Sequence, residues 1–278
     1  NGFILVNKQK DVSSNFVVQE IKKKIKAKKV GHMGTLDPLA SGLLVLAINR
    51  ATKFSSYFLE SEKSYDVEVA LGISTDTDDS TGNIISESND CPDEELIMKE
   101  LYRFKGESFQ VPPFFSALKH KGKPLYYYAR KGEFISKPAR KIKVINIEDF
   151  KYKNKICSFR IQCSKGTYIR SIARDLGERL GCGAHMKSLI RISQGKFCIS
   201  KSKEISHLSK EDIISIERAF EDLESITIKS EHEKKFINGV TIPELKHKDN
   251  IYRVFSKDNT FIGIGEIKDS FLNHKQLV

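Results

Sequence analysis

The chain has 278 residues, of which 39% are hydrophobic and 30% are charged, proportions typical of a soluble globular protein that buries a sizeable core. No run approaches the roughly 18 consecutive apolar residues of a membrane helix, and the first residues show no signal-peptide pattern, so the expected location is the cytoplasm. The formal net charge of +11 favours a polyanionic partner without specifying which one, and lysines that only keep the chain soluble would give the same total.

The first expected elements are a strand at residues 3–6 and a helix at residues 15–29. Val17, Ile21 and Ile25 recur every four positions and predict a narrow buried stripe along this helix. Its other faces carry six lysines: Lys22, Lys23, Lys24, Lys26, Lys28 and Lys29. Because this run leads directly into a glycine-rich loop, we expect Lys22, Lys23 and Lys26 to contact a phosphate backbone, although a solvated surface would explain the same charges.

The loop at residues 31–42 has the composition of a functional site. It contains three glycines, one proline and two hydroxyl residues around a single carboxylate, Asp37. Pro38 biases the Asp37 backbone toward an extended conformation, and the apolar run at 43–48 predicts a buried strand that anchors the loop. A lone acid on a rigid loop suits covalent or general-base chemistry, whereas Asp-Pro can also be a simple turn starter.

The next part of the chain predicts a helix at residues 51–59 and a strand at 65–71, whose first residue, Tyr65, belongs either to the core or to a cleft. Pro92 and the acids after it start another helix. Residues 114–131 then interleave aromatic and basic side chains, a composition that suits nucleic-acid binding. Three consecutive tyrosines in this segment cannot share one helix face, so at least one of them is expected in the core.

Strands are expected at residues 142–147, 156–163 and 189–192. The second of them runs into a glycine turn and then a helix, an arrangement that forms generic anion sites. Arg170 stands in the first turn of that helix, where a cation opposes the helix dipole. Its placement indicates a partner carboxylate or phosphate, with an ordinary surface arginine as the alternative.

The pattern of predicted elements changes after about residue 200. Ser209 and Asp212 have the spacing of a capping box that opens an acidic amphipathic helix, whose apolar residues are Ile213, Ile216, Phe220 and Leu223. From about residue 231 the chain reads as short strands, with a hairpin turn at 257–259. These features predict a small appended β domain.

Metal and disulfide chemistry find little support in the sequence. The five cysteines are an odd number without a CxxC pair, so no disulfide framework is expected. Cys182 and His185 make only half of a zinc site. The acidic segment 76–87 has calcium-loop spacing, but its glycine falls at the seventh position instead of the sixth, which argues against a cation there.

Four segments, in this order along the chain, resemble the bacterial tRNA pseudouridine synthases of the TruB type: GHMGTLDPLASGLLVLAINRATKF, SEKSYDVEVALGISTDTDDSTG, PPFFSALKHKGKPLYYYARKG and CSKGTYIRSIARDLGERLGCGAHMKSLIR. The resemblance covers residues 1 to about 200, and the C-terminal piece looks like a reduced PUA-type RNA-binding module. One early element departs from the family pattern. The family usually has Lys-Pro-x-Gly-x-Ser-Ser, whereas residues 8–14 lack the proline and the glycine.

The resemblance implies an α+β fold, with a largely antiparallel sheet and flanking helices at residues 1–205 and a small β-rich PUA-like domain at residues 206–278. It implies that the protein isomerises uridine 55 in the T-loop of tRNA to pseudouridine, with Asp37 as the nucleophile. The reaction oxidises nothing and releases nothing, so no cofactor or metal is expected. The expected partner is the T-arm of tRNA, with no membrane, and the protein is expected to be a monomer.

The resemblance also assigns roles to individual residues. Arg170 would pair with Asp37 and keep its carboxylate ionised, and Tyr65 completes the catalytic set. A uridine inside a folded RNA loop must be flipped out before it can react. The side chains expected to hold the base, or to fill the space that it leaves, are His32, Tyr65, Tyr168 and Leu189.

A non-catalytic RNA-binding module is the alternative from another functional class. Residues 31–34 match the GxxG loop of KH domains. A KH loop joins two helices, however, and this loop runs through Asp37 and Pro38 into a predicted strand. A third possibility, a metal-dependent hydrolase, lacks a cluster of ligands.

Overall fold

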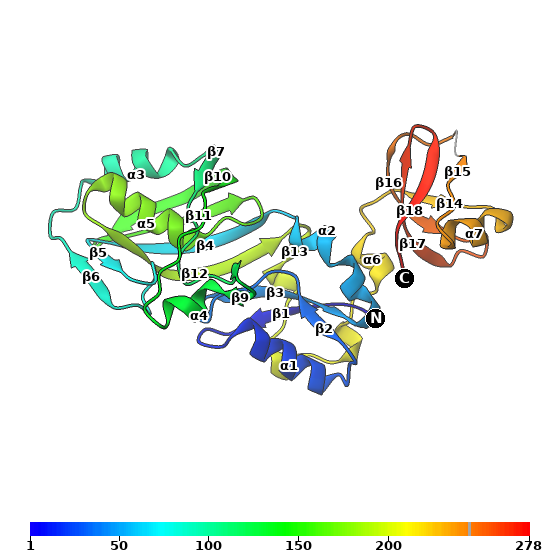
Figure 1. The fold of residues 1–278 in the computed structure, drawn as a ribbon, viewed down its shortest axis with the longest axis horizontal. Coiled ribbons are helices and arrows are strands. Elements are labelled where there is room, and N and C mark those ends of the chain that lie inside the picture. The colour runs from blue at the N-terminus through cyan, green and yellow to red at the C-terminus, as the bar shows by residue number, and fades with distance from the viewer. Residues whose placement is uncertain (244–245) are drawn as a thin grey trace.

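The computed structural model describes residues 1–243 and 246–278. Within these ranges the chain forms a large sheet flanked by helices and, at its C-terminal end, a smaller separate sheet (Figure 1). The strands of the large sheet are β1 (Gly2–Lys8), β2 (Val30–His32), β3 (Ser41–Ile48), β4 (Lys63–Leu71), β7 (Gly106–Gln110), β10 (Arg140–Lys153), β11 (Ile156–Cys163), β12 (Ala184–Gln194) and β13 (Phe197–Cys198). The strand order is β1-β3-β12-β4-β11-β10-β7, with β2 beside β3 and β13 beside β12. This arrangement confirms the mixed α+β class.

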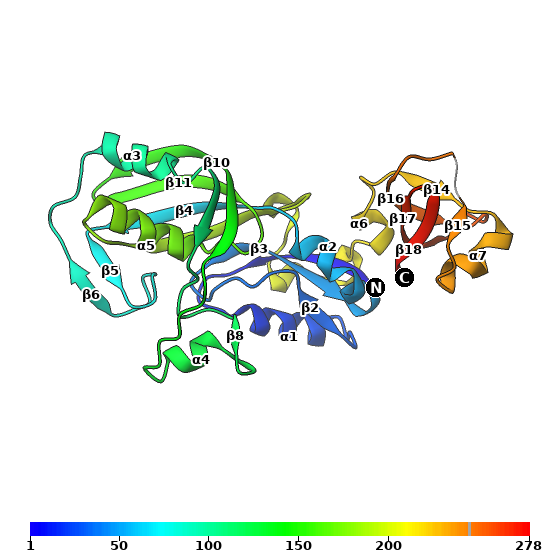
Figure 2. The same ribbon diagram turned by 45° about the horizontal axis from the view of Figure 1, so that its top comes forward.

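The large sheet is antiparallel except where β3 meets β12, through Ser41 and Gly42. Every second residue of β4 is buried, so one face of the strand belongs to the core. That face packs beneath α3 (Glu94–Tyr102) and α5 (Ile169–Leu180), as Figures 1 and 2 show from two directions. The β3 strand is buried on both faces, which fixes the far end of the glycine-rich loop.

The first helix, α1 (Ser14–Lys24), packs its stripe of Val17 and Ile21 against the strands at the N-terminal end of the sheet. Ser13 caps it by accepting a hydrogen bond from the Phe16 amide at 3.0 Å. The helix is shorter than the expected 15–29, because Lys26 takes a left-handed conformation with φ of 55°. The expected helix at 51–59 forms as a 3₁₀ turn (Asn49–Phe54) followed by α2 (Ser55–Leu59).

The segment between β7 and β10 holds β8 (Lys119–His120), β9 (Lys123–Pro124) and α4 (Leu125–Ala129), and it projects from the body of the sheet (Figure 2). The expectation that one of the three consecutive tyrosines is in the core was wrong. Leu125 and Ala129, four positions apart, are buried instead, and all three tyrosines keep exposed surface. The acidic segment forms the turn and second strand of a hairpin of β5 (Ile73–Thr75) and β6 (Ile84–Glu87).

The amphipathic helix expected after Ser209 does not form as one piece. The capping box is present, but it caps a 3₁₀ turn at Lys210–Asp212, and α6 covers only Ile216–Ala219. Ile216 and Phe220 instead join a core cluster with residues of β1, β3, the Asn49–Phe54 turn and α2. Phe220, for example, lies 5.3 Å from Phe58 between ring centroids. Two further 3₁₀ segments lie at Ile199–Lys201 and Ile205–His207.

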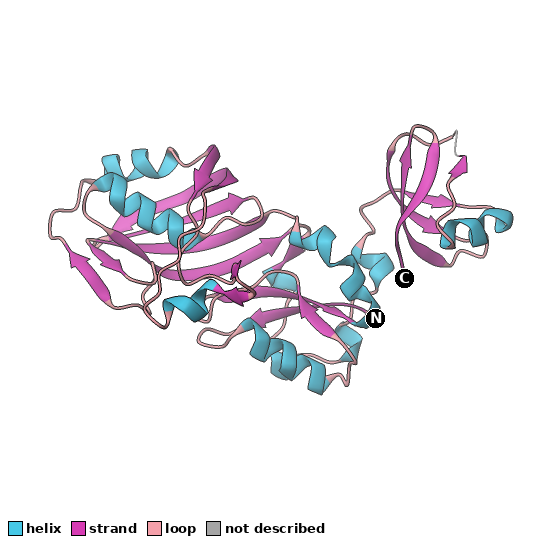
Figure 3. Cartoon of the chain, viewed as in Figure 1, coloured by secondary structure: helices cyan, strands magenta, loops and turns pink. Residues whose placement is uncertain are grey.

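The C-terminal sheet has the strand order β14-β16-β17-β18-β15 and is drawn at the right of Figure 3. Its strands are β14 (Ser225–Thr227), β15 (Ile242–Pro243), β16 (Asn250–Phe255), β17 (Phe261–Lys268) and β18 (Phe271–Leu277). The turn predicted at 257–259 does join two antiparallel strands. A helix, α7 (Ser230–Ile237), stands where only strands were expected, and it buries Phe236. Across the described residues, the helices fall short of the length and apolarity needed to cross a membrane.

Candidate active site

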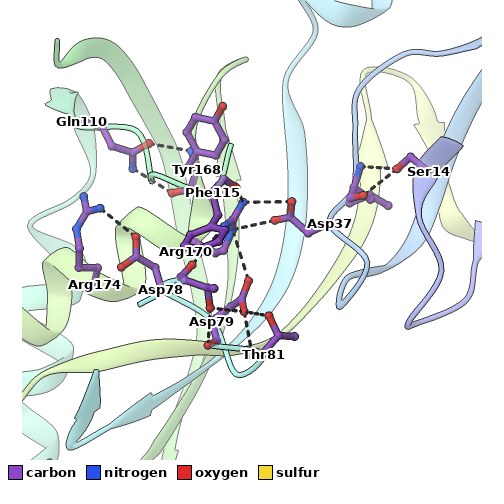
Figure 4. Close-up of polar contacts among 12 residues, drawn as sticks. Ser14, Asp37, Asp78, Asp79, Thr81, Gln110, Phe115, Tyr168, Arg170 and Arg174 are labelled. Atoms are coloured by element: carbon purple, nitrogen blue, oxygen red, sulfur yellow. Dashed lines mark hydrogen bonds and ion pairs between the residues drawn. The ribbon is translucent and has the colours of Figure 1, made fainter. Parts of the chain in front are cut away.

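The loop that carries Asp37 lies between β2 and β3, and side chains from elsewhere in the chain hold it in place. Ser14 Oγ both donates to the Leu36 carbonyl and accepts from the Leu36 amide, each at 2.8 Å (Figure 4). On the other side of Asp37, the Pro38 carbonyl accepts from the Asp11 amide at 2.8 Å and from Lys8 Nζ at 3.2 Å. The backbone on both sides of Asp37 is therefore fixed. Because strands, not helices, flank residues 31–34, the KH alternative does not match the fold.

The turn at residues 8–14, which lacks the family's proline and glycine, contacts the Asp37 loop through Lys8, Asp11 and Ser14. Asp11, which stands where the family pattern has glycine, adopts a left-handed conformation with φ of 65°. Aspartate tolerates this region better than most side chains. Lys8, with no exposed surface, donates to the carbonyls of Gln9 and Val12 as well as to Pro38. Burial lowers the pKa of Lys8 to about 8, against the opposing effect of Asp37.

Arg170 reaches Asp37 from the first turn of α5. Its Nε lies 2.9 Å from one carboxylate oxygen of Asp37, and its Nη2 lies 3.2 Å from the other. The guanidinium is buried, whereas about a third of the Asp37 side chain is exposed. Arg170 also donates to the carbonyls of Thr77 and Phe115 (Figure 4). These contacts fix the arginine, and the arginine in turn holds the Asp37 carboxylate where part of it is exposed to solvent.

A second carboxylate, Asp79, approaches the same arginine at 3.8 Å. It is 5% exposed and accepts hydrogen bonds from the hydroxyls of Thr77 and Thr81. The sequence reasoning missed this role because it weighed the acidic segment only as a cation loop. The sequence did hold one clue to this role: the acidic segment lies inside one of the four stretches that resemble the family. Asp79 approaches the same Nε atom of Arg170 as Asp37 does and adds a second negative charge beside the buried guanidinium.

The neighbouring Asp78 pairs with Arg174 of α5 at 3.0 Å. Burial raises the pKa of Asp78 to about 6, while the arginine acts in the opposite direction. Two successive carboxylates of one loop therefore hold two arginines one turn apart on α5. This ties the acidic segment to the helix that supplies Arg170.

A pocket of about 290 Å³ opens beside Asp37. The predicted residues Asp37, Tyr65, Tyr168, Arg170 and Leu189 all line it. They come from the loop, β4, the start of α5 and β12, so the fold brings together segments more than 150 residues apart. His32 does not line the pocket. It lies at the end of β2, partly buried, and burial together with Arg191 lowers its pKa.

The two tyrosines are held by different means. Tyr65 is 7% exposed, and burial raises its pKa to about 12. The backbone of Tyr168 exchanges two hydrogen bonds with the Gln110 side chain, and the Arg140 guanidinium lies 4.6 Å from the Tyr168 ring centroid. Tyr65 therefore forms part of the pocket floor, whereas Tyr168 lies near its rim.

Two buried cations in the pocket lining, Lys63 and Arg191, escaped the sequence reasoning. Lys63 Nζ donates to the carbonyls of Leu59 and Ser61. Burial, with Arg191 next, lowers the pKa of Lys63 to about 8. Neither residue stood in a motif that pointed to a site: Lys63 lies between Glu62 and Ser64, and Arg191 lies between Ile190 and Ile192.

Lys63 predicts a specific pH dependence of stability. Between pH 8 and 10.5 the unfolded chain still binds the lysine proton that the folded protein has released, so the free energy of unfolding rises with pH across this window. A Lys63→Met variant lacks this contribution. The difference in unfolding free energy, wild type minus variant, is expected to rise by up to about 3 kcal/mol from pH 8 to 10.5, measured by urea titration. A difference that stays flat over this window would contradict the shifted pKa.

Comparison with family models identifies the chain's relatives. A model described as "TruB family pseudouridylate synthase (N terminal domain)" matches residues 22–169, more than half of the chain. The chain belongs to the TruB family of pseudouridylate synthases. Two C-terminal models also match this TruB-family chain, "tRNA pseudouridylate synthase B C-terminal domain" at residues 170–227 and "Pseudouridine synthase II TruB, C-terminal" at residues 225–278.

Full-length relatives of the TruB-family chain agree with this assignment. It is 40% identical to tRNA pseudouridine synthase B of Clostridium kluyveri, over 97% of this chain and 96% of that protein. It is 38% identical to the protein of the same name from Francisella tularensis subsp. novicida, over 99% and 94%. Among solved structures, an H/ACA ribonucleoprotein bound to a substrate RNA containing 2′-deoxyuridine holds a chain with a TM-score of 0.72 and 22% identity, matched over 99% of this chain and 84% of that one. This last likeness shows the shared fold.

Basic and aromatic surfaces of the TruB-family chain lie outside the pocket. Lys22, Lys23 and Lys26 are exposed on and just after α1, as the sequence suggested, whereas Lys24 donates to the carbonyls of residues 205 and 206. On the projecting segment, two lysine ammonium groups lie 4.4 and 4.6 Å from the Tyr127 ring centroid. Within the described residues, no group of three or more His, Cys, Asp or Glu side chains is placed to hold a metal ion.

Proposed function

We propose that this chain converts uridine 55 in the T-loop of tRNA to pseudouridine, with Asp37 as the nucleophile. One observation carries the proposal: among the described pocket-lining residues, Asp37 is the single carboxylate, and a buried arginine holds it facing the cavity. The printed names of the full-length relatives, tRNA pseudouridine synthase B, support tRNA as the substrate. Family membership supports the type of reaction.

The proposed reaction replaces the bond between N1 and the ribose with a bond between C5 and the ribose. The nucleotide has the same atoms before and after it. The Asp37 carboxylate adds either to the uracil ring or to the anomeric carbon of the ribose. The bond between N1 and the ribose breaks, the base rotates, and C5 forms the new bond to the ribose. The bond to Asp37 then breaks or is displaced in the same step, which regenerates the free carboxylate. C5 loses its proton and N1 gains one, so the sum is an isomerisation. Arg170 would keep the carboxylate aimed at the target through both halves of the reaction.

The flipped base would bind in the pocket beside Asp37. Tyr65 and Tyr168 offer ring faces or edges for it, and Leu189 offers an apolar contact from β12. His32, outside the lining and five residues before Asp37, would occupy the space that the base leaves in the RNA. Residues 1–205 would perform the chemistry, and residues 206–278 would add an RNA-binding surface in the manner of a PUA domain.

An unmodified tRNA transcript tests the proposal directly. The wild-type chain is expected to form one pseudouridine per transcript, at position 55, without added cofactor. A transcript with cytidine at position 55 is the matched control and is expected to give none. Pseudouridine at another position would overturn the proposed target, and a chain that binds the transcript without modifying it would favour the RNA-binding alternative.

The lysines around α1 predict a change in salt dependence. Each lost phosphate contact is expected to reduce the slope of log affinity against log salt by roughly 0.7 to 0.9. Replacing Lys22, Lys23 and Lys26 with glutamine should therefore flatten the slope by roughly 2 to 3, in tRNA binding measured from 50 to 300 mM salt.

The control is an equal loss of charge at the far end of the sheet. Lys151, Lys153 and Lys155, exposed at the hairpin between β10 and β11, are replaced with glutamine in the same way. This variant is expected to keep the wild-type slope. If the two triple variants change the slope equally, the lysines around α1 have no special contact with the RNA and form only a solvated surface.

A further inference from the structure

Arg191 is among the largest fully buried side chains of the protein, with 1% of its surface exposed. On β12 it lies directly across from Tyr65 of β4 and, on the other side, across from Gly42 at the start of β3. Residues opposite one another on antiparallel strands have adjacent side chains. The position therefore places one cation between the tyrosine of the pocket floor and the strand that ends the Asp37 loop.

The Arg191 side chain holds the loop at both ends. Its Nε donates to the Leu43 carbonyl at 2.7 Å, and its Nη2 donates to the Gly34 carbonyl at 3.0 Å. Gly34 precedes Asp37 by three residues, and Leu43 follows it by six. A Cβ on Gly42 would lie 2.5 Å from the Arg191 carbonyl oxygen, so the loop also packs tightly against the backbone of β12. Gln194, three residues on, donates to the Met33 and Phe58 carbonyls and adds a further tie.

The charge of Arg191 lacks the usual compensation. Over residues 1–243 and 246–278, no carboxylate lies within 4.0 Å of the guanidinium. Lys8, His32 and Lys63 lie near enough for Arg191 to lower their pKa values, and Tyr65 lies directly opposite it on β4. Arg191 also lowers the pKa of the Tyr65 hydroxyl, against the larger effect of burial. An uncompensated buried cation is costly to stability, and such a group is retained where it serves a site.

We propose that Arg191 is a positioning residue that fixes the Tyr65 hydroxyl and both ends of the Asp37 loop in one frame. In this frame the Tyr65 ring and the Asp37 carboxylate keep the separation that the isomerisation requires. The guanidinium suits the task because its planar fork donates in several fixed directions at once. The proposal rests on the proposed function of the pocket. It concerns the rate of the chemical step, because Arg191 is 1% exposed at the base of the pocket and two of its guanidinium nitrogens already donate to backbone carbonyls.

Three variants separate this role from a general loss of packing. Arg191→Met removes the charge and the donors but keeps the length, and Arg191→Lys keeps the charge without the fork. Arg160→Gln, on the other face of the same sheet and paired with Asp66, is the matched control. Circular dichroism and tRNA affinity first establish that each variant is folded and binds.

Single-turnover rates at saturating tRNA provide the kinetic test. Arg191→Met is expected to slow pseudouridine formation by about 100-fold, with the dissociation constant for tRNA close to wild type. Arg191→Lys is expected to recover part of the loss, and Arg160→Gln to match the wild type. A wild-type rate for Arg191→Met, or an equal loss for Arg160→Gln, would overturn the proposal.

A double variant with Tyr65→Phe tests whether Arg191 acts through the tyrosine. If it does, adding Arg191→Met to Tyr65→Phe should cost much less than the same change in the wild type. Losses that multiply would show that Arg191 acts independently of Tyr65.

A readout without substrate keeps this proposal distinct from the proposed function. In protein labelled with ¹³C at the phenol carbon of tyrosine, the Tyr65 signal is assigned by its loss in Tyr65→Phe. This signal is expected to shift in Arg191→Met and to stay in place in Arg160→Gln. An unmoved signal would contradict the contact whether or not the protein modifies tRNA, whereas a wild-type chain that forms no pseudouridine would contradict the function alone.

Discussion

Replacing Asp37 with asparagine is expected to abolish pseudouridine formation while leaving tRNA affinity nearly unchanged. Asparagine has almost the same size, so the loop tied down by Ser14 and Lys8 keeps its shape. Its amide, however, is not a competent nucleophile, and no other acid among the described residues lines the pocket to replace it. The measurement is a single-turnover assay on unmodified tRNA transcript, with affinity determined by filter binding.

The control for this variant is Asp66→Asn, which removes a carboxylate from the opposite face of the sheet, where it pairs with Arg160. It is expected to form pseudouridine at the wild-type rate. Appreciable modification by Asp37→Asn would eliminate Asp37 as the nucleophile. Loss of tRNA binding by the same variant would mean that Asp37 holds the RNA rather than attacking it.

Replacing Arg170 with alanine is expected to reduce the single-turnover rate by about 100-fold or more, with a much smaller effect on affinity. The guanidinium holds both oxygens of Asp37 at 2.9 and 3.2 Å, so its loss frees the carboxylate to rotate away from the substrate. It also leaves the buried Asp79 without its cation, which adds a stability loss expected to lower the melting temperature.

Arg179→Ala, on the same helix, supplies the comparison for Arg170. This arginine stacks on Phe104 at 3.9 Å and contacts neither carboxylate, so its loss is expected to leave turnover unchanged. An Arg170→Ala variant that keeps the wild-type rate would show that Asp37 does not depend on the arginine. A loss confined to affinity would instead place Arg170 among the RNA contacts.

Local sequence signals were enough to predict most elements and the centre of the site. The glycines and Pro38 predicted a rigid loop, and the apolar run after them predicted the buried β3 strand. Arg170 was singled out because a cation in the first turn of a helix needs an anionic partner, and the structure places Asp37 and Asp79 beside it. These inferences needed only the chemistry of neighbouring residues.

The residues that the sequence did not reveal act across long separations in the chain. Arg191 meets Gly34 over 157 positions, and no local pattern predicts that contact. The role of Asp79 was missed for another reason. Its segment has the spacing of a cation loop, and only the folded structure shows that Arg170 lies beside it. The helix expected after Ser209 did not form as one piece, because Phe220 packs onto Phe54 and Phe58 and tertiary packing overrode the helical spacing.

The release of hydrogen from C5 tests the central claim most directly. In the proposed reaction C5 exchanges its hydrogen for the ribose carbon, so tRNA transcribed with tritium at C5 of its uridines must release one tritium per molecule to water. With enzyme in excess, the wild-type chain is expected to release one equivalent, and Asp37→Asn none while still binding the tRNA. Release by Asp37→Asn at the wild-type rate, or no release by a wild-type chain that binds the tRNA, would contradict the account.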